Sequence, residues 1–375
     1  MFFHQLGNTG SKGGETVNTF YCKTKILKGD ASEALKSLQI QSMLLVVDPF
    51  FLENGVARGL VGEVKAPKSR IFSDVSPDPT VELAAQGTAV VKEFDPDTIV
   101  ALGGGSAMDC AKAMAYFSPK RVRLVAIPTT SGSGSEVTDF AVLTHGSTKH
   151  PLVDEKVCPD VAILDEKLLS ELPKNLIADA GFDVLCHALE GYVATGAGEI
   201  SDALAKEAFC VTFAHLPASY AGNKGVRGTI HTAATMAGMA FSQAGLGLCH
   251  GMAHSLGGMF HVPHGRLNAI LMPSVIGCNA LVAAPKYAKI ARAAGISGAA
   301  ESVAVRNLRN SLVRLRRELH LPETLQQAGI NPRSVRQRSK EIIQTVLEDP
   351  CCKTNPLPVA DFMVGKILEE VTGHG

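Results

Sequence analysis

The residues best suited to chemistry in this sequence are histidines gathered in one glycine-rich stretch, GLGLCHGMAHSLGGMFHVPHG, at positions 245–265. His250 and His254 are four residues apart, so a helix would place them on one face, one turn from each other. Imidazole is the commonest metal ligand in proteins, and its proton comes and goes near neutral pH. The stretch therefore indicates metal binding or proton transfer.

A second pair with the same spacing, Asp183 and His187, lies upstream in GFDVLCHALEGY. With the histidines downstream it would supply one carboxylate and three imidazoles from two helical segments, a ligand set for a divalent metal. Spacing alone leaves a second interpretation open, in which these are ordinary helix histidines. His261 either lines the pocket or caps a loop. Cys186 and Cys249 are expected to pack, since each points about 100° away from the histidine that follows it.

The composition excludes several classes of function. Lysine plus arginine and aspartate plus glutamate number 36 each, so the formal net charge is zero and neither a nucleic acid nor an anionic membrane is an expected partner. We find no uninterrupted apolar run long enough to cross a bilayer, and no signal peptide at the start. The nine scattered cysteines lack the CxxC spacing of structural zinc sites, which favours free thiols in a reducing cytosol.

The first half of the chain alternates short apolar runs with helical stretches. The expected strands are 42–48, 69–75, 97–106 (which runs into a glycine turn) and 123–130, and the expected helices are 81–93 and 107–117. This alternation is typical of a parallel sheet covered by helices on both faces, an α/β, Rossmann-like architecture. Such sheets bind their ligands at the carboxyl ends of the strands.

The length of 375 residues is large for a single core, so two domains are expected. From about Pro173 the apolar residues follow a helical period and no convincing strand occurs, which predicts an all-α second domain. We therefore divide the chain into a disordered extension at 1–16, a nucleotide-binding α/β domain at 17–174 and a helical domain at 175–375.

Small residues follow two of the expected strands, as GGGS at 103–106 and TTSGSGS at 129–135. Glycines at the start of a helix let backbone amides approach a diphosphate, whose charge the helix terminus stabilises. A tight turn and a solvated loop are the alternatives, since GGGSxxD is not the GxGxxG fingerprint. Asp48, which ends the first of these strands, could bind ribose hydroxyls and repel a 2′-phosphate, favouring NAD(H) over NADP(H). An aspartate that merely ends a strand is the alternative.

With these motifs the sequence resembles the iron-containing alcohol dehydrogenases over about residues 20–356. Within that family it looks most similar to the propanol and ethanol dehydrogenases of propanediol and ethanolamine utilisation. The resemblance implies a fold like that of dehydroquinate synthase, with a nucleotide-binding α/β domain followed by a helical domain and an active site between them. The motifs are DPFF (48–51), PDPT (77–80), GGGSAMDCAKA (103–113), IPTTSGSGSEVT (127–138), PDVAILDEKLL (159–169), GFDVLCHALEGYV (181–193), the long run at 241–273 and EDPCCKTNP (348–356).

The resemblance also implies roles for individual residues. The implied metal ligands are Asp183, His187, His250 and His264, and His254 is implied to be a pocket histidine that helps to move a proton. The implied cofactor contacts are Asp48, Asp78, Gly104, Gly105, Ser106, Asp109, Thr129, Thr130, Ser133, Thr138 and Lys149. Three positions depart from the family pattern: Asp78 is often asparagine, Ser133 is often threonine, and Cys352 adds a second cysteine to a tail motif that usually has one.

The activity that follows is that of an alcohol dehydrogenase with NAD(H) and Fe(II), although the ligand types alone also admit Zn(II). A divalent cation held in this way is a Lewis acid for an alcohol or aldehyde oxygen, beside the nicotinamide that carries the hydride. We expect interconversion of a short-chain primary alcohol, such as propanol or ethanol, and its aldehyde, with the enzyme working as an aldehyde reductase. An apolar lining is expected from Phe140, Met252 and Phe260.

Two alternatives remain open. One is a zinc-dependent, glycerol-dehydrogenase-like enzyme or a dehydroquinate-synthase-like lyase; a lyase would need a basic pocket, yet Arg266 is the one basic residue besides histidine at 245–267. The other is a nucleotide-binding or microcompartment-associated protein without turnover. We expect a homodimer or larger assembly in the cytoplasm or inside a bacterial microcompartment, with a shell protein or an aldehyde dehydrogenase as a candidate partner.

Overall fold

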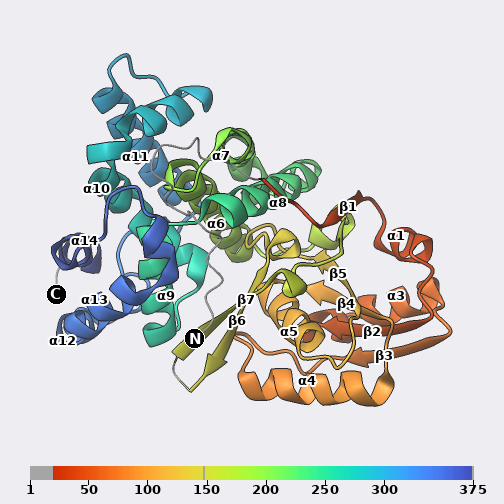
Figure 1. The fold of residues 1–375 in the computed structure, drawn as a ribbon. Helices are drawn as coiled ribbons and strands as arrows, with labels where there is room; N and C mark the ends of the chain where they lie inside the picture. Colours follow the sequence, from red (N-terminus) through yellow and green to blue (C-terminus); the bar gives the residue numbers. More distant parts are fainter. Residues whose placement is uncertain (1–19, 147, 374–375) are drawn as a thin grey trace, which may run out of the picture.

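The computed structural model describes residues 20–146 and 148–373, without the side chains of residues 148 and 149. The extension expected at 1–16 lies outside the described residues. Figure 1 shows a sheet with its covering helices in the first half of the chain and a group of helices in the second. The strands are β1 Lys25–Lys28, β2 Ser42–Val47, β3 Lys68–Phe72, β4 Thr98–Gly103, β5 Arg123–Pro128, β6 Phe140–His145, β7 Thr148–Val153 and β8 Val161–Leu164.

The helices divide between the two halves. In the first half they are α1 Ala31–Ser37, α2 Pro49–Glu53, α3 Val56–Val64, α4 Val81–Phe94 and α5 Gly105–Tyr116. In the second half they are α6 Lys174–Val193, α7 Glu199–Tyr220, α8 Arg227–Ala244, α9 Leu248–Phe260, α10 His264–Ala293, α11 Glu301–Glu318, α12 Pro332–Gln337, α13 Ser339–Glu348 and α14 Asp361–Thr372. Two 3₁₀ turns also matter for the site, η1 Ser135–Val137 and η5 Pro350–Thr354.

Six strands form one parallel sheet in the order β1-β8-β5-β4-β2-β3. Alternate residues of each strand point to opposite faces. Leu44 and Val46 pack in one cluster with residues of α4 and α5, whereas Met43, Leu45 and Val47 pack with residues of α1, α2 and α3. Both faces are therefore buried, which confirms the expected architecture.

The order of the strands reverses between β2 and β4. From β2 the chain runs through α3 to β3 on one side, and from β4 it runs through α5 to β5 on the other. Ligands of open parallel sheets bind at such a reversal, outside the carboxyl ends of the strands. Asp48, Gly104 and Thr129 follow β2, β4 and β5, so the order of the strands brings them to one edge.

An antiparallel hairpin of β6 and β7 stands apart from the sheet, and the sequence analysis did not predict it. Its first strand alternates buried and half-buried residues, and Gly146 takes a left-handed backbone at the turn, with φ of 60°. The hairpin is tied to the PDPT loop, because the Thr144 N–H donates to the Pro79 carbonyl at 2.9 Å. The sequence indicated this hairpin only by a short alternation of apolar and polar residues before Gly146. That pattern is weaker than the alternation of strands and helices in the rest of this half.

The helical half is built around α6, which is buried from Gly181 to Val193. The change from sheet to helices falls at Pro173, immediately before α6, while the expected boundary between residues 174 and 175 stays a prediction. α6 packs against α7, α8 and α10, so side chains on several of its faces are in contact with other helices. Its polar side chains are consequently held in fixed surroundings.

One helix of the described ranges, α10, is long and apolar enough by composition to cross a membrane. The sequence analysis found no uninterrupted apolar run long enough to cross a bilayer, whereas α10 meets the criterion by the mean hydropathy of an 18-residue window. The prolines at 273 and 285 lie inside α10 and do not end it. The Pro273 carbonyl accepts a hydrogen bond from Arg309 Nε at 2.7 Å. Most of the apolar window, 61%, is buried in the protein, so α10 is a core helix here.

Candidate metal centre and cofactor loops

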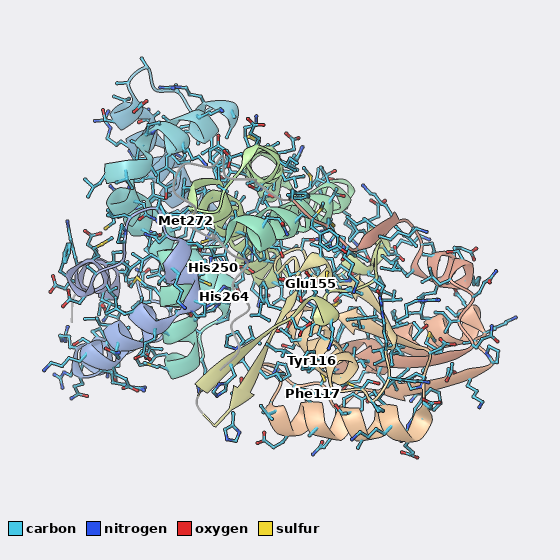
Figure 2. All side chains as sticks on the ribbon, in the orientation of Figure 1. Tyr116, Phe117, Glu155, His250, His264 and Met272 are labelled. Carbon is cyan, nitrogen blue, oxygen red and sulfur yellow. The ribbon has the colours of Figure 1, made fainter. Side chains whose placement is uncertain are left out.

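Three imidazoles converge on one carboxylate oxygen, and the four side chains come from three helices. Asp183 and His187 lie on α6, His250 on α9, and His264 is the first residue of α10. Asp183 Oδ1 is 3.9 Å from His187 Nδ1, 3.9 Å from His250 Nε2 and 3.6 Å from His264 Nε2. Figure 2 shows His250 and His264 close to one another in the helical half. The structure thus brings together the four residues that the sequence offered as metal ligands.

Two of these ring nitrogens lack partners. His187 Nδ1 and His250 Nε2 are buried, and neither has a hydrogen-bond partner within the described part of the chain. An unpaired buried polar atom is costly, so such atoms usually belong to a site that something else completes. Burial lowers the pKa of both histidines, for His250 to well below its usual value, which favours the neutral ring with a free lone pair. A divalent cation placed between these ring nitrogens and the Asp183 carboxylate would accept their lone pairs and complete the site.

Glu190 fixes the orientation of His250. Its Oε2 lies 2.6 Å from His250 Nδ1, and its carboxylate accepts the backbone N–H groups of Gly247 at 3.0 Å and Cys249 at 2.7 Å. Burial raises the pKa of Glu190 to about 7, and these hydrogen bonds oppose the rise. A carboxyl group on one ring nitrogen leaves the other nitrogen for a metal. Sequence reasoning missed this residue, although its position three residues after His187 on α6 could have revealed it.

The start of α10 approaches α6 closely enough to place His264. A Cβ atom at Gly265 would lie 2.0 Å from the Asp179 carbonyl oxygen, so only glycine permits this approach. Arg266 donates two hydrogen bonds to the Asp179 carboxylate, at 3.2 and 2.9 Å. Asn268 Nδ2 donates to Asp183 Oδ1 at 2.9 Å and so positions the carboxylate. Arg266, the basic residue noted in the sequence, is therefore engaged by Asp179.

His254 lies next to this cluster with a carboxylate of its own. Its Nδ1 is 2.9 Å from Asp349 Oδ2, and its ring stacks on His264 with centroids 5.1 Å apart. Burial acts to raise the pKa of Asp349, yet hydrogen bonds from His254 and the Cys351 backbone hold it below its usual value. Asp349 therefore stays ionised and orients the imidazole. His261, in contrast, is an exposed residue in the left-handed conformation that caps the C-terminus of α9.

The two small-residue loops face each other at the sheet edge. Cβ atoms built at Gly104 and Gly105 would come within 3.5 Å of Thr130 Oγ1 and 3.8 Å of Ser133 Oγ. Ser135 Oγ donates to Asp109 Oδ1 at 3.3 Å, which links η1 to α5. The other expected contacts in these loops are Ser106, in the first turn of α5, and the buried Thr129 after β5.

The remaining expected cofactor residues occupy different surroundings. Asp48 caps α2 by accepting the Phe50 N–H at 3.0 Å. Asp78 is exposed with φ of 53°, a left-handed conformation that asparagine and aspartate tolerate better than most residues, which explains their exchange at this position. Thr138 is fully buried, and its hydroxyl accepts a hydrogen bond from Lys112 at 3.0 Å. Lys149 lies in β7, and its side chain is outside the described structure.

Lys112 is a further residue that sequence reasoning missed. It is buried on α5, and its Nζ donates to the Thr138 carbonyl at 3.0 Å and to the Phe140 carbonyl at 2.7 Å. Burial lowers its pKa to about 8. Lys112 thereby links α5, the helix after the glycine loop, to the residues that follow η1. These hydrogen bonds hold the two loops in a fixed relation to each other.

One loop also touches the metal cluster. A Cβ atom at Gly132 would lie 3.4 Å from Asp183 Oδ2, and the Gly132 backbone hydrogen-bonds to His187. A nucleotide bound at the loop after β5 would therefore lie beside the cation. The apolar lining is only partly as expected: Phe140 packs near Phe241, which stacks on His187 at 4.4 Å, whereas Met252 is fully buried in the core. The ring of Phe260 lies under Arg338.

Comparison with known proteins identifies the family. Residues 24–166 match the family described as iron-containing alcohol dehydrogenase, and residues 177–372 match the C-terminal part of the Fe-containing alcohol dehydrogenase family. The chain belongs to the iron-containing alcohol dehydrogenases. It is accordingly an NAD-dependent alcohol oxidoreductase, and the family uses NAD(H) and iron.

Several members of the family resemble the chain along most of its length. The 1-propanol dehydrogenase PduQ of Salmonella typhimurium is 38% identical over 95% of this chain and 100% of its own. The NADPH-dependent butanol dehydrogenase of Clostridium saccharobutylicum is 36% identical over 90% of this chain and 93% of its own. The solved iron-containing alcohol dehydrogenase of Thermococcus thioreducens superposes with a TM-score of 0.86 at 31% identity, covering 94% and 99% of the two chains.

The role of Glu190 can be tested by Glu190→Gln, which keeps the shape of the side chain and removes its charge. We expect iron affinity to fall about 10–100-fold, because the carboxylate that orients His250 is lost. Competition with a chelator, followed by metal analysis, measures this. Glu171→Gln is the control, since Glu171 is exposed and pairs with Lys224 at the surface. Unchanged iron retention in Glu190→Gln would contradict the assignment.

The role of Asp48 can be tested by Asp48→Asn, which retains an oxygen to cap α2 and removes the charge. We expect the preference for NADH over NADPH, as the ratio of the kcat/KM values, to fall about ten- to a hundredfold, because one repulsion of the 2′-phosphate disappears. Steady-state kinetics with both cofactors measure the ratio. A ratio equal to that of the unmodified enzyme would show that Asp48 does not face the ribose.

Proposed function

We propose that this dehydrogenase interconverts a short-chain primary alcohol and its aldehyde, and that it works as an aldehyde reductase that regenerates NAD. The observation that carries the proposal is the contact between the cofactor loop at Gly132 and the metal cluster at Asp183. A small substrate would bind beside the phenyl rings of Phe140 and Phe241. Arg266 is paired with Asp179, so it does not offer an acidic substrate a free charge. The similarity to a 1-propanol and a butanol dehydrogenase supports the same substrate class.

We assign each group of residues a task in the reaction. Asp183, His187, His250 and His264 would hold the iron, which when bound supplies a Lewis acid for the substrate oxygen while the nicotinamide carries the hydride. The loops after β4 and β5 would hold the cofactor diphosphate, and Asp48 its ribose. His254 would relay the proton between solvent and the substrate oxygen, since its ring lies beside His264 and is partly exposed.

Assembly and location extend the proposal. We propose a homodimer or larger oligomer in the cytoplasm, or inside a bacterial microcompartment with an aldehyde dehydrogenase or a shell protein as partner. The similarity to the 1-propanol dehydrogenase PduQ of Salmonella typhimurium, which covers that enzyme's whole length, supports this setting.

The substrate class is tested by an anaerobic assay of the metal-free protein reloaded with iron or with zinc. With NADH we expect turnover of acetaldehyde, propionaldehyde and butyraldehyde by the iron form, and a higher kcat/KM for these aldehydes than for dihydroxyacetone. Oxygen should inactivate the iron form. A preference for dihydroxyacetone with zinc would instead indicate a polyol dehydrogenase, and cofactor binding without turnover in either form would refute an enzymatic role.

The proton role of His254 is tested by His254→Ala. We expect kcat for aldehyde reduction to fall about 10²–10⁴-fold, because a positioned acid–base group is removed. His261→Asn is the matched control: it removes an exposed histidine of the same stretch and keeps a residue that tolerates the left-handed cap. Full turnover by His254→Ala at all pH values would contradict the proposal.

A further inference from the structure

A second group of metal-binding side chains lies beside the first. His254, Asp349 and Cys351 each offer one ligand atom, and the three atoms lie within 4.8 Å of one another. All three residues are half-buried, in contrast to the buried Asp183, His187 and His250. The imidazole, carboxylate and thiol are the three kinds of side chain that zinc prefers.

The fold holds these three residues together. Asp349 precedes η5, and its Oδ1 accepts the Cys351 N–H at 2.9 Å while its Oδ2 lies 2.9 Å from His254 Nδ1. The turn is packed on α9, since a Cβ atom at Gly251 would lie 2.5 Å from Cys352 Sγ. The carboxylate therefore reaches both neighbours at once, and the buried Cys352 anchors the turn that carries Cys351.

We propose that His254, Asp349 and Cys351 form a second cation site, selective for a thiolate-binding divalent cation such as Zn²⁺, whose occupation inhibits the enzyme. The thiolate selects zinc over the hard cations magnesium and calcium. Binding releases the Cys351 thiol proton to solvent, and the thiolate and the Asp349 carboxylate then balance the two charges of the cation. Because the occupied second site has no net charge, it adds little electrostatic repulsion to the iron bound nearby.

Inhibition rests on the proposed function, in which His254 moves the substrate proton. An imidazole ring with one nitrogen bound to a cation cannot take up a second proton, so it cannot relay one, and the cation also draws Asp349 away from its role of orienting the ring. Zinc would thus inhibit without displacing iron from the cluster around Asp183.

The test titrates anaerobically prepared, iron-loaded enzyme with Zn²⁺, and in parallel with Co²⁺ as a spectroscopic probe. We expect a second metal equivalent per chain, a thiolate-to-cobalt charge-transfer absorption, and loss of turnover while the iron is retained. In Cys351→Ser the absorption should vanish. The zinc concentration for half-inhibition, measured relative to the rate of the same variant without zinc, should rise at least about tenfold. Cys352→Ala is the matched control and should keep both effects. If it does not fold, Cys278→Ser, a half-buried thiol on α10, replaces it.

The outcomes separate the site from the function that it regulates. Zinc inhibition of equal strength in Cys351→Ser, loss of iron as zinc binds, or an absorption that depends on Cys352 would each overturn the second site. A second equivalent with a Cys351-dependent absorption but no inhibition would uphold the site and overturn the proton role of His254.

Discussion

Two imidazole nitrogens, on His187 and His250, lie buried opposite one carboxylate oxygen, and neither has a hydrogen-bond partner among the described residues 20–146 and 148–373. The helices are packed in a way that maintains this arrangement. Glu190 holds the far side of the His250 ring, Asn268 holds Asp183, and a glycine at position 265 lets the start of α10 reach α6. Such an arrangement costs free energy unless a cation completes it. Iron binding and the stability of the helical half are therefore coupled.

The sheet supplies the loops proposed to bind the cofactor, and one of these loops contacts the metal cluster. Strand order brings the loops after β2, β4 and β5 to a single edge, and the last of these loops meets α6 at Asp183. Lys112 supports the same loops from within the sheet domain, and its three hydrogen bonds use each of its ammonium protons. Hydride transfer requires the nicotinamide and the substrate oxygen to be neighbours, and in the proposed function this contact would place them so.

The sequence predicted the elements whose patterns are strong and local. Alternation of strands and helices predicted the covered parallel sheet, and the i, i+4 spacing of Asp183 with His187 predicted two ligands on one helical face. It did not predict Glu190, Asp349 or Lys112, because a carboxylate or an ammonium group gains its role from a partner far away in the chain. It also failed on Met252, which was expected to line the pocket and is buried in the core, because an apolar side chain suits either position.

Iron K-edge X-ray absorption of the anaerobically reconstituted enzyme measures the ligand atoms directly. We expect a first shell of nitrogen and oxygen only, with multiple scattering from three imidazoles, and loss of one imidazole in His264→Ala. A sulfur neighbour, which Cys186 would provide from its place 3.7 Å from His250 Nδ1, or fewer than three imidazoles in the unmodified enzyme, would contradict it.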